Sequence, residues 1–344
     1  MRYLLIIMAL VTVAFSGCGG IQTEPEQDNT TQEFAPSTEN ISEPVIDTEP
    51  DKDIPPVIEL PSDIEEKEEV TSFVWTSDPG IRYEDASVPF VHRLNDGRIR
   101  LYHGGRNGIS CAISEDGLAF NEEAVAIIRQ GRPGDMDTIV SDPTVVKIED
   151  DRVRMYYKGA DGPGGPGQAV HTVHSAVSSD GLNFEYEGIR IDSQLTPDRG
   201  WASVPDAIVL PDGRVRLYYV SDGLDVGHGI VSAISSDGLN FTREGPVLTG
   251  YVDPSVIMLP DERYLMLAVA FLTGPKDTTG DFSPGIYSFI SEDGINFGEG
   301  SLALAGEGNL DPAIIENSDG TYRIYYWNIN DNPNVIRSFS GVIR

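Results

Sequence analysis

Apolar and polar residues alternate along much of the chain between residues 72 and 344, with the two-residue period of β-strands. The segment RVRLYY, which begins at Arg214, is typical: basic and apolar side chains alternate and then give way to a pair of tyrosines. No stretch of this region keeps the 3.6-residue period of an amphipathic helix. The pattern therefore predicts an all-β fold.

These strands belong to a unit that recurs five times. Each copy has an apolar strand containing a Pro, then a turn, then a second strand that starts nine residues after the Pro. The five prolines are separated by 54, 62, 49 and 58 residues, which indicates one structural unit with loops of different length. The copies read SVPFVHRLNDGRIRLYH, SDPTVVKIEDDRVRMYY, SVPDAIVLPDGRVRLYY, VDPSVIMLPDERYLMLA and LDPAIIENSDGTYRIYY, with Pro89, Pro143, Pro205, Pro254 and Pro312.

A third strand ends in a Ser-x-Asp-Gly-x-x-Phe turn in four of the copies, at Ser114, Ser178, Ser235 and Ser291. Asp-Gly supplies the positive φ angles that tight turns between strands require. Three strands and a short fourth after each turn form a four-stranded antiparallel sheet. Five such sheets predict a five-bladed β-propeller. A β-sandwich of repeated hairpins is the alternative, but it would not explain five copies of a three-strand unit.

The fifth copy ends at Arg344 without an Asp-Gly turn or a clear fourth strand. We expect residues near Ser72 to Trp75 to supply the missing outer strand and close the ring.

The first residues read as a secretory signal: Arg2 is followed by an apolar run from Tyr3 to Phe15. This run is shorter than the roughly 20 residues that a membrane-spanning helix needs. The sequence Phe15-Ser16-Gly17-Cys18 resembles the bacterial lipobox, although Phe15 stands where Leu is usual. The resemblance implies cleavage before Cys18, acylation of Cys18 and an extracytoplasmic protein anchored by lipid. An ordinary cleaved signal is the alternative.

Composition divides the chain into a signal at 1–17, a disordered acidic tether at 18–71 and the propeller at 72–344. Residues 19–70 carry sixteen acidic and two basic residues, a net charge of −14, which favours an extended, disordered segment. The rest of the chain beyond the signal carries −18. This charge argues against a nucleic-acid partner, which would require clustered Lys and Arg. We expect a monomer that contacts the membrane only through its lipid.

The chain has only two cysteines, so a disulfide framework is excluded. Cys111 lies in an apolar strand and aligns with serines in other copies. It is expected to be a small buried residue rather than a nucleophile.

An Asp-Pro that opens a blade, followed by Asp-Gly and a strand ending in Tyr-Tyr, resembles the propellers of glycoside hydrolase families 43 and 32. These belong to the arabinanase, levansucrase and invertase superfamily. The Asp-Gly turns are also similar to the Asp-boxes of sialidases, which are structural there. The resemblance covers about residues 72 to 344. It implies a pocket where the innermost strands begin, with an Asp as base or nucleophile, a second Asp, and a Glu as general acid.

Three aspartates occupy the position before the Pro in equivalent strands: Asp142, Asp253 and Asp311. The other two copies have Val88 and Val204, and no copy has a Glu at either of the two positions before its Pro. Asp142 is therefore the candidate base or nucleophile, with Asp206 or Asp85 as proton donor. Asp253 and Asp311 would tune pKa values or hold a calcium ion in the channel. A purely structural role in turns is the alternative for all three.

Loops that should open on the same face carry donors, carboxylates and one large aromatic side chain. Sugar hydroxyl groups need paired donors and acceptors, and the sugar C–H face stacks on aromatic rings. The candidate substrate-binding residues are Arg106, Lys158, His171, His228, Trp201 and Asp222. Two histidines are too few for a catalytic zinc, which usually takes three protein ligands, so they predict no metal site.

Together these features predict a glycoside hydrolase-like surface lipoprotein that binds a carbohydrate at the channel mouth. Cleavage of that carbohydrate by these carboxyl groups is a further hypothesis. The alternative is a non-catalytic propeller that presents a ligand- or protein-binding face.

Overall fold

The computed structural model describes residues 73–132, 135–149, 152–224, 227–271 and 282–343. The expected signal, the tether and Cys18 lie outside these residues. In the described part there are twenty-one strands and no helix, which confirms the all-β prediction. It follows that no described segment is a helix able to cross a membrane.

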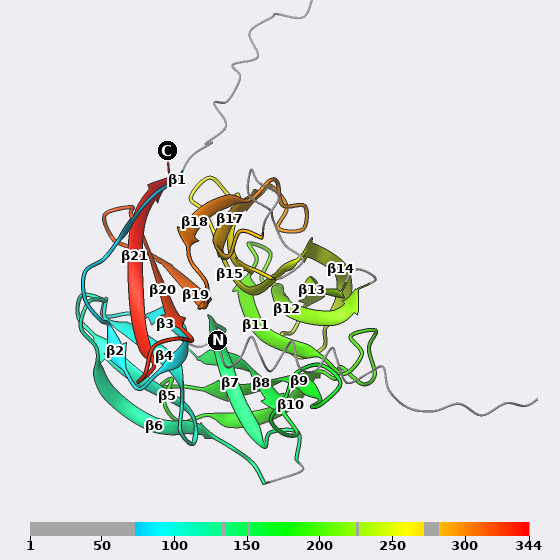
Figure 1. Cartoon of the computed structure of the whole chain (residues 1–344). Helices are drawn as coiled ribbons and strands as arrows, with labels where there is room; N and C mark the ends of the chain where they lie inside the picture. The colour runs from blue at the N-terminus through cyan, green and yellow to red at the C-terminus, as the bar shows by residue number, and fades with distance from the viewer. Residues whose placement is uncertain (1–72, 133–134, 150–151, 225–226, 272–281, 344) are drawn as a thin grey trace, which may run out of the picture. The chain divides into compact units, whose positions relative to one another are not determined.

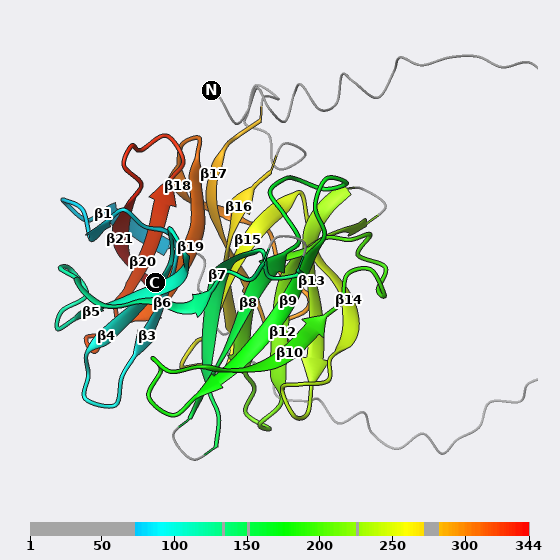
Figure 2. The ribbon, with the colours of Figure 1, turned by 90° about the horizontal axis from the view of Figure 1, so that it is seen from below.

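Five antiparallel sheets surround one axis, as a five-bladed propeller requires (Figure 1). The innermost strands β3, β7, β11, β15 and β19 contact one another in a closed ring, and the blades lie side by side around it (Figure 2). Blade 1 contains β3 (Ser87–Arg93), β4 (Ile99–Gly105), β5 (Gly108–Ser114) and β6 (Asn121–Arg129); blade 2 contains β7 (Ile139–Lys147), β8 (Val153–Ala160), β9 (His171–Ser178) and β10 (Glu185–Ile191). Blade 3 contains β11 (Ala202–Val209), β12 (Val215–Leu224), β13 (Gly227–Ser235) and β14 (Thr242–Thr249); blade 4 contains β15 (Tyr251–Met258), β16 (Tyr264–Ala270), β17 (Gly285–Ser291) and β18 (Ser301–Ala305).

Blade 5 combines the two ends of the propeller. It contains β19 (Asn309–Glu316), β20 (Tyr322–Asn328), β21 (Val335–Ile343) and, as its outer strand, β1 (Phe73–Ser77). The register pairs Phe73 with Ile343 and Ser77 with Phe339, and the short β2 (Tyr83–Glu84) also pairs with β21. The expected closure is thus confirmed, and the closing strand extends beyond Trp75 to Ser77.

The Asp-Gly turns join each blade to its neighbour through what we call the interblade latch. An Arg and a Tyr of one second strand donate hydrogen bonds to the Asp and Gly carbonyls of the next blade's turn, and the Arg also pairs with an acidic residue. There are four latches among the described residues. The donors and the residues whose carbonyls accept are Arg100 and Tyr102 with Asp180 and Gly181, Arg154 and Tyr156 with Asp237 and Gly238, Arg216 and Tyr218 with Asp293 and Gly294, and Arg323 and Tyr325 with Asp116 and Gly117. Blade 4 has Leu265 and Leu267 at these positions, because blade 5 has no such turn.

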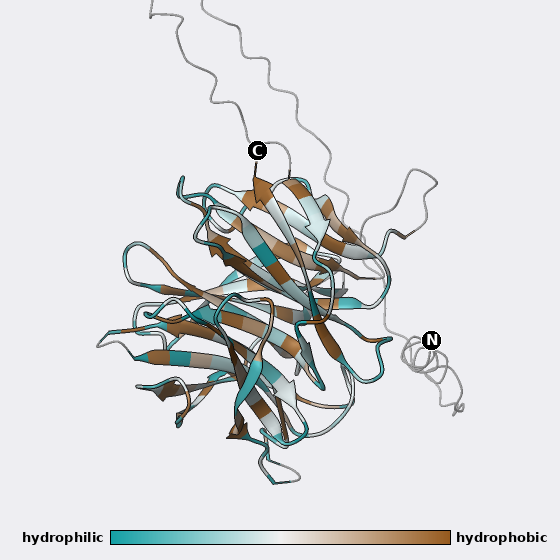
Figure 3. Cartoon of the chain, turned by 90° about the vertical axis from the view of Figure 1, so that its left-hand side faces the viewer, coloured by the Kyte–Doolittle hydropathy of each residue, from teal (hydrophilic) through white to brown (hydrophobic). Residues whose placement is uncertain are grey.

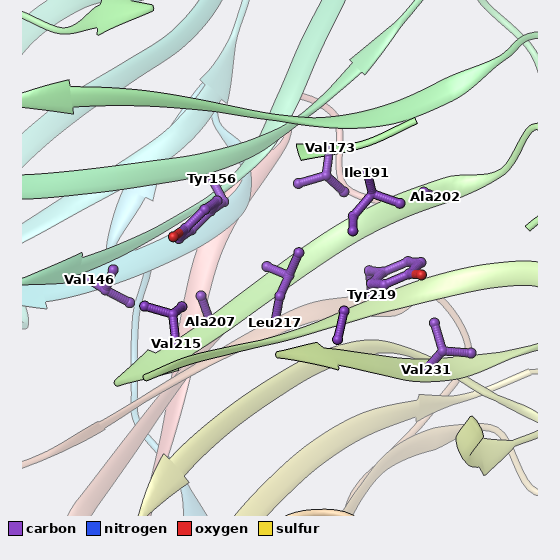
Figure 4. Close-up of a cluster of buried hydrophobic side chains, with 11 residues drawn as sticks. Val146, Tyr156, Val173, Ile191, Ala202, Ala207, Val215, Leu217, Tyr219 and Val231 are labelled. Carbon is purple, nitrogen blue, oxygen red and sulfur yellow. The ribbon is translucent and has the colours of Figure 1, made fainter. Parts of the chain in front are cut away.

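The core lies between adjacent blades, where the apolar faces of neighbouring sheets meet. Apolar residues follow the strands (Figure 3), and Figure 4 shows the cluster between blades 2 and 3, in which Tyr156 faces Val215 and Leu217. The free thiol of Cys111 is fully buried, and burial raises its pKa to about 12. Cys111 is therefore a buried small residue, as expected.

Candidate functional site

All five innermost strands bend at the residue before their proline. That residue has a left-handed conformation in every blade, with φ between 46° and 54°. A register shift in the pairing to the second strand marks a β-bulge at the same place in all five blades. Left-handed non-glycine residues cost on the order of 1–3 kcal/mol each and are common at functional sites. We call the five residues the axial ring: Val88, Asp142, Val204, Asp253 and Asp311.

The second strand of each blade places one residue beside the axial ring, fifteen positions after the proline. In blade 2 this residue is Lys158, whose ammonium group forms an ion pair with Asp142. In blade 5 it is Trp327, whose indole Nε1 donates a hydrogen bond to Asp311 Oδ2 at 2.6 Å. Blade 1 has Gly104, where a Cβ atom would lie 2.8 Å from Val88. Trp327 was missed from the sequence, although its offset from Pro312 equals that of Lys158 from Pro143.

Asp253 has fewer partners, because Val269 occupies the matching position in blade 4. The backbone amide of Asp311 donates a hydrogen bond to Asp253 Oδ2 at 3.4 Å. Burial, together with the negative charge of Asp142, raises the pKa of Asp253 to about 7. Burial and the carboxyl groups of Asp253 and Asp142 also raise the pKa of Asp311 well above its usual range. Both side chains therefore hold their protons to a higher pH than an exposed aspartate does.

Asp142 is held differently from the other two aspartates. Its carboxylate pairs with Lys158 and accepts a hydrogen bond from Ser141 Oγ at 2.9 Å. Burial lowers the pKa of Lys158, but the carboxylates of Asp142, Asp311 and Asp253 outweigh it and the net pKa is raised. The site thus combines one ion pair with two carboxyl groups whose pKa values are raised.

The cavity at the axial ring is small, about 20 Å³, enough for about one water molecule. A sugar would therefore have to lie over the opening rather than inside the channel. The cavity is lined by Val88, Pro89, Phe90, Asp142, Pro143, Val204, Pro205, Asp206, Pro254, Ser255, Asp311 and Pro312.

Asp206, a predicted proton donor, joins three blades. Its carboxylate accepts hydrogen bonds from Thr144 Oγ1 in blade 2, at 2.8 Å, and from the Val256 amide in blade 4, at 2.6 Å. Thr144 and Ser255, at the same place in their strands, likewise accept from backbone amides of the next blade. Burial raises the pKa of Asp206 to about 7, but its two carboxylate oxygens are already engaged. The contacts indicate a structural role. The other predicted donor, Asp85, is exposed in the loop after β2.

The predicted histidines and Trp201 form a row across blades 2 to 4. His171 stacks on Trp201 with ring centroids 3.6 Å apart, and Trp201 lies 6.4 Å from the ring of His228. His228 Nδ1 is 3.2 Å from Asp222 Oδ1, and its ring meets the edge of Phe271. Since His171 covers one face of Trp201, that face is not free to stack on a sugar. Burial, aided by the charge of Lys158, lowers the pKa of His171 to about 3, which keeps it neutral.

The structure therefore brings together Asp142, Asp253, Asp311 and Lys158, and separately His171, Trp201, His228 and Asp222. Arg106 is exposed in the β4–β5 turn. Within the described residues, no group of three or more His, Cys, Asp or Glu side chains is arranged to hold a metal ion. The calcium ion remains a prediction, and Lys158 already places a positive charge beside Asp142.

No family model matches this chain, and no curated protein matches it in sequence. Solved structures do share its fold. A thermostable family-43 glycoside hydrolase has a TM-score of 0.57 and 16% identity, covering 76% of this chain and 91% of that one. An α-L-arabinofuranosidase from Lactobacillus brevis gives 0.56 and 12%, covering 74% and 91%.

A family 117 glycoside hydrolase from Zobellia galactanivorans gives a TM-score of 0.59 and 19% identity, covering 79% of this chain and 90% of that one. At these identities the likeness establishes the fold. The chain therefore has the five-bladed propeller fold that glycoside hydrolases of families 43 and 117 also have.

Proposed function

We propose that this protein binds a carbohydrate over the axial ring, at the end of the channel where the innermost strands begin. The observation that carries the proposal is the chemistry of that ring. Carboxyl groups of Asp142, Asp253 and Asp311 lie beside an ammonium group and an indole N–H. Sugar hydroxyl groups need both acceptors and donors, and this arrangement offers both. The solved structures with this fold include an α-L-arabinofuranosidase and two glycoside hydrolases, which supports a sugar ligand.

Hydrolysis is the second candidate function, favoured by the raised pKa values of Asp253 and Asp311 beside the ion-paired Asp142. A glycoside hydrolase uses one ionised and one protonated carboxyl group on either side of the scissile bond. Asp142, paired with Lys158, would be the base or nucleophile, and Asp311 or Asp253, whose pKa values are raised, would donate the proton. Asp206 is less suited to donate, because its carboxylate joins three blades.

A calorimetric titration of the full chain against a panel of neutral and charged oligosaccharides tests binding. Asp142→Asn should weaken binding of the best ligand at least tenfold, because it removes the ion pair that orders Lys158. Asp212→Asn is the matched control, since Asp212 lies in an exposed turn and pairs only with Arg214. Equal affinity of Asp142→Asn and the wild type would place the sugar elsewhere.

Release of phenol from aryl glycosides, measured beside this titration, separates the two functions. Turnover that is lost in Asp142→Asn supports hydrolysis. Binding without turnover supports a purely carbohydrate-binding propeller, and a lack of binding to every glycan would favour a propeller with a protein-binding face.

We also propose where the protein is located in the cell. A lipidated Cys18 would anchor the propeller to the outside of a bacterial membrane, with the acidic residues 19–70 as a spacer and the propeller acting as a monomer. The support comes from the lipobox-like Phe15-Ser16-Gly17-Cys18 and from the −14 charge of the spacer.

A further inference from the structure

A second, larger cavity lies beside the row of His171 and Trp201. We call it the side groove; its volume is about 670 Å³, within the range of ligand pockets, whereas the cavity at the axial ring holds about 20 Å³. The side groove is lined by Val170, Ser193, Gln194, Thr196, Pro197, Arg199, Gly200 and Gly223. Val170, Gly200 and Gly223 each adjoin in sequence one of the predicted site residues His171, Trp201 and Asp222.

The floor of the side groove is rigid, because a buried carboxylate holds the loop of residues 192–201. Asp198 is fully buried; it accepts hydrogen bonds from Ser221 Oγ and Thr196 Oγ1, both at 2.6 Å, and from Tyr219 Oη at 3.0 Å. The Arg243 guanidinium also lies 3.4 Å from Asp198. These contacts tie the loop to strands β12 and β14 of the same blade.

The backbone of the same loop is fixed as well. The Gly200 amide donates to the Ser193 carbonyl and the Trp201 amide to the Asp198 carbonyl, both at 3.0 Å. Gly223 packs so closely on the Pro197 carbonyl that a side chain there would collide with it. A groove with fixed walls needs little reorganisation when a ligand binds.

Arg199 gives the side groove its charge. It is the only charged residue of the lining, it is exposed, and its guanidinium has no ion pair with any described residue. Its backbone is left-handed, with φ of 54°, a conformation that is strained for a residue other than glycine. A chain whose net charge is −31 thus presents an uncompensated Arg at the lip of a polar groove. A guanidinium in such a place suits a carboxylate, which it can bind through two parallel hydrogen bonds.

We infer that the side groove is a binding site for the acidic residue of an oligosaccharide, with Arg199 contacting the carboxylate of a uronic acid. Ser193, Gln194 and Thr196 supply the polar groups, and Val170 and Pro197 supply apolar surface for sugar C–H groups. This inference rests on the proposed function and makes it more specific: the ligand is an oligosaccharide long enough to reach from the axial ring past Trp201.

The test compares uronate oligosaccharides with their methyl esters, which have the same shape but no charge. The full chain should bind the charged form of its best ligand about tenfold more tightly than the ester, since a hydrogen-bonded charge contributes about that factor. Arg199→Gln keeps the left-handed backbone and removes the charge, so it should abolish the preference. Arg214→Gln, in an exposed turn where Arg214 pairs with Asp212, should leave it unchanged.

The possible outcomes separate this inference from the proposed function. Equal affinity for acid and ester, or a preference that survives in Arg199→Gln, would contradict carboxylate binding in the side groove. The proposal that a sugar binds at the axial ring would still stand. Failure to bind any glycan, charged or neutral, would overturn both. A preference for the acid that is lost only in Arg199→Gln supports the inference.

Discussion

Asp253 accepts a hydrogen bond from the backbone amide of Asp311, at 3.4 Å, across the boundary between blades 4 and 5. This contact exists because both residues occupy the left-handed position before a proline, one blade apart. The same bulge in every blade turns the side chain at this position toward its neighbours in the axial ring. Three of the five side chains are carboxyl groups, and among the described residues only Asp142 forms an ion pair with a cation.

The contribution of Asp253 to stability should therefore fall as the pH rises toward neutrality. A carboxyl group with a raised pKa binds its proton more tightly in the folded chain, so its contribution is complete below the unfolded pKa of about 3.9 and is lost as the pH passes the folded value. That value is about 7 for Asp253. We expect the part of the free energy of unfolding that Asp253 contributes to decline between pH 5 and 8, by on the order of 1 kcal/mol per pH unit.

Denaturant titrations at several pH values measure this decline. Asp253→Asn should change the profile by this slope, because an amide does not titrate. Asp212→Asn should not, since hydrogen bonds to Arg214 lower the pKa of Asp212 and its titration lies below this window. Parallel profiles of the wild type and Asp253→Asn from pH 5 to 8 would contradict the assignment.

The ion pair of Lys158 with Asp142 gives a second prediction. Lys158→Met should destabilise the fold by about 2–4 kcal/mol, because it leaves the buried Asp142 carboxylate without its cation. The double variant Lys158→Met with Asp142→Asn should regain most of this loss, since neither charge remains. Chemical denaturation of both variants measures the difference. Similar instability in the single and double variants would mean that packing, rather than charge, is the main contribution of Lys158.

Local sequence patterns were sufficient to predict the blades and the Asp-Gly turns, because each depends on residues near one another in the chain. The closing strand followed from the incomplete fifth copy of the repeat, although it pairs Phe73 with Ile343. The equivalence of Asp142, Asp253 and Asp311 followed from the repeat. The partners of Asp206 did not, because Thr144 and Val256 come from other blades and meet it only once the ring is closed. Likewise, the stacking of His171 on Trp201 depends on how blades 2 and 3 pack. Trp327 could have been found, since it has the same offset from its proline as Lys158.

Lipidation of Cys18 should determine whether the protein is attached to the membrane. Cys18→Ala should move the protein from the membrane fraction to the soluble fraction and abolish incorporation of labelled fatty acid. Cys111→Ala is the matched control, because the Cys111 thiol is fully buried and cannot take up lipid. Fractionation and labelling of cells that express each variant measure the effect. A Cys18→Ala protein that still labels and still pellets with membranes would rule out the lipid anchor.

The interblade latch should contribute measurably to stability. Tyr218→Phe leaves the Gly294 carbonyl without the hydroxyl group that donates to it at 2.8 Å, and we expect a loss of about 1–2 kcal/mol. Tyr264→Phe is the control, because Tyr264 is also a buried tyrosine but its hydroxyl group forms no hydrogen bond with a described residue. Thermal unfolding of the two variants should separate them by several degrees. Equal midpoints would show that the latch tyrosines act only through their rings.

The closure of the ring by β1 can be tested at Gly341, the residue of β21 that pairs with Trp75. The Trp75 ring lies directly over Gly341, and a Cβ atom added there would collide with that ring and lie 2.6 Å from the Val74 carbonyl. Gly341→Ala should therefore push β1 away and cost about 1–3 kcal/mol. Gly162→Ala is the control, because nothing lies within 4 Å of a Cβ atom at that position. If both variants unfold at the wild-type denaturant concentration, β1 contributes little to holding blade 5. If Gly341→Ala alone is destabilised and becomes sensitive to proteolysis near β1, the N-terminal strand is what keeps the propeller closed.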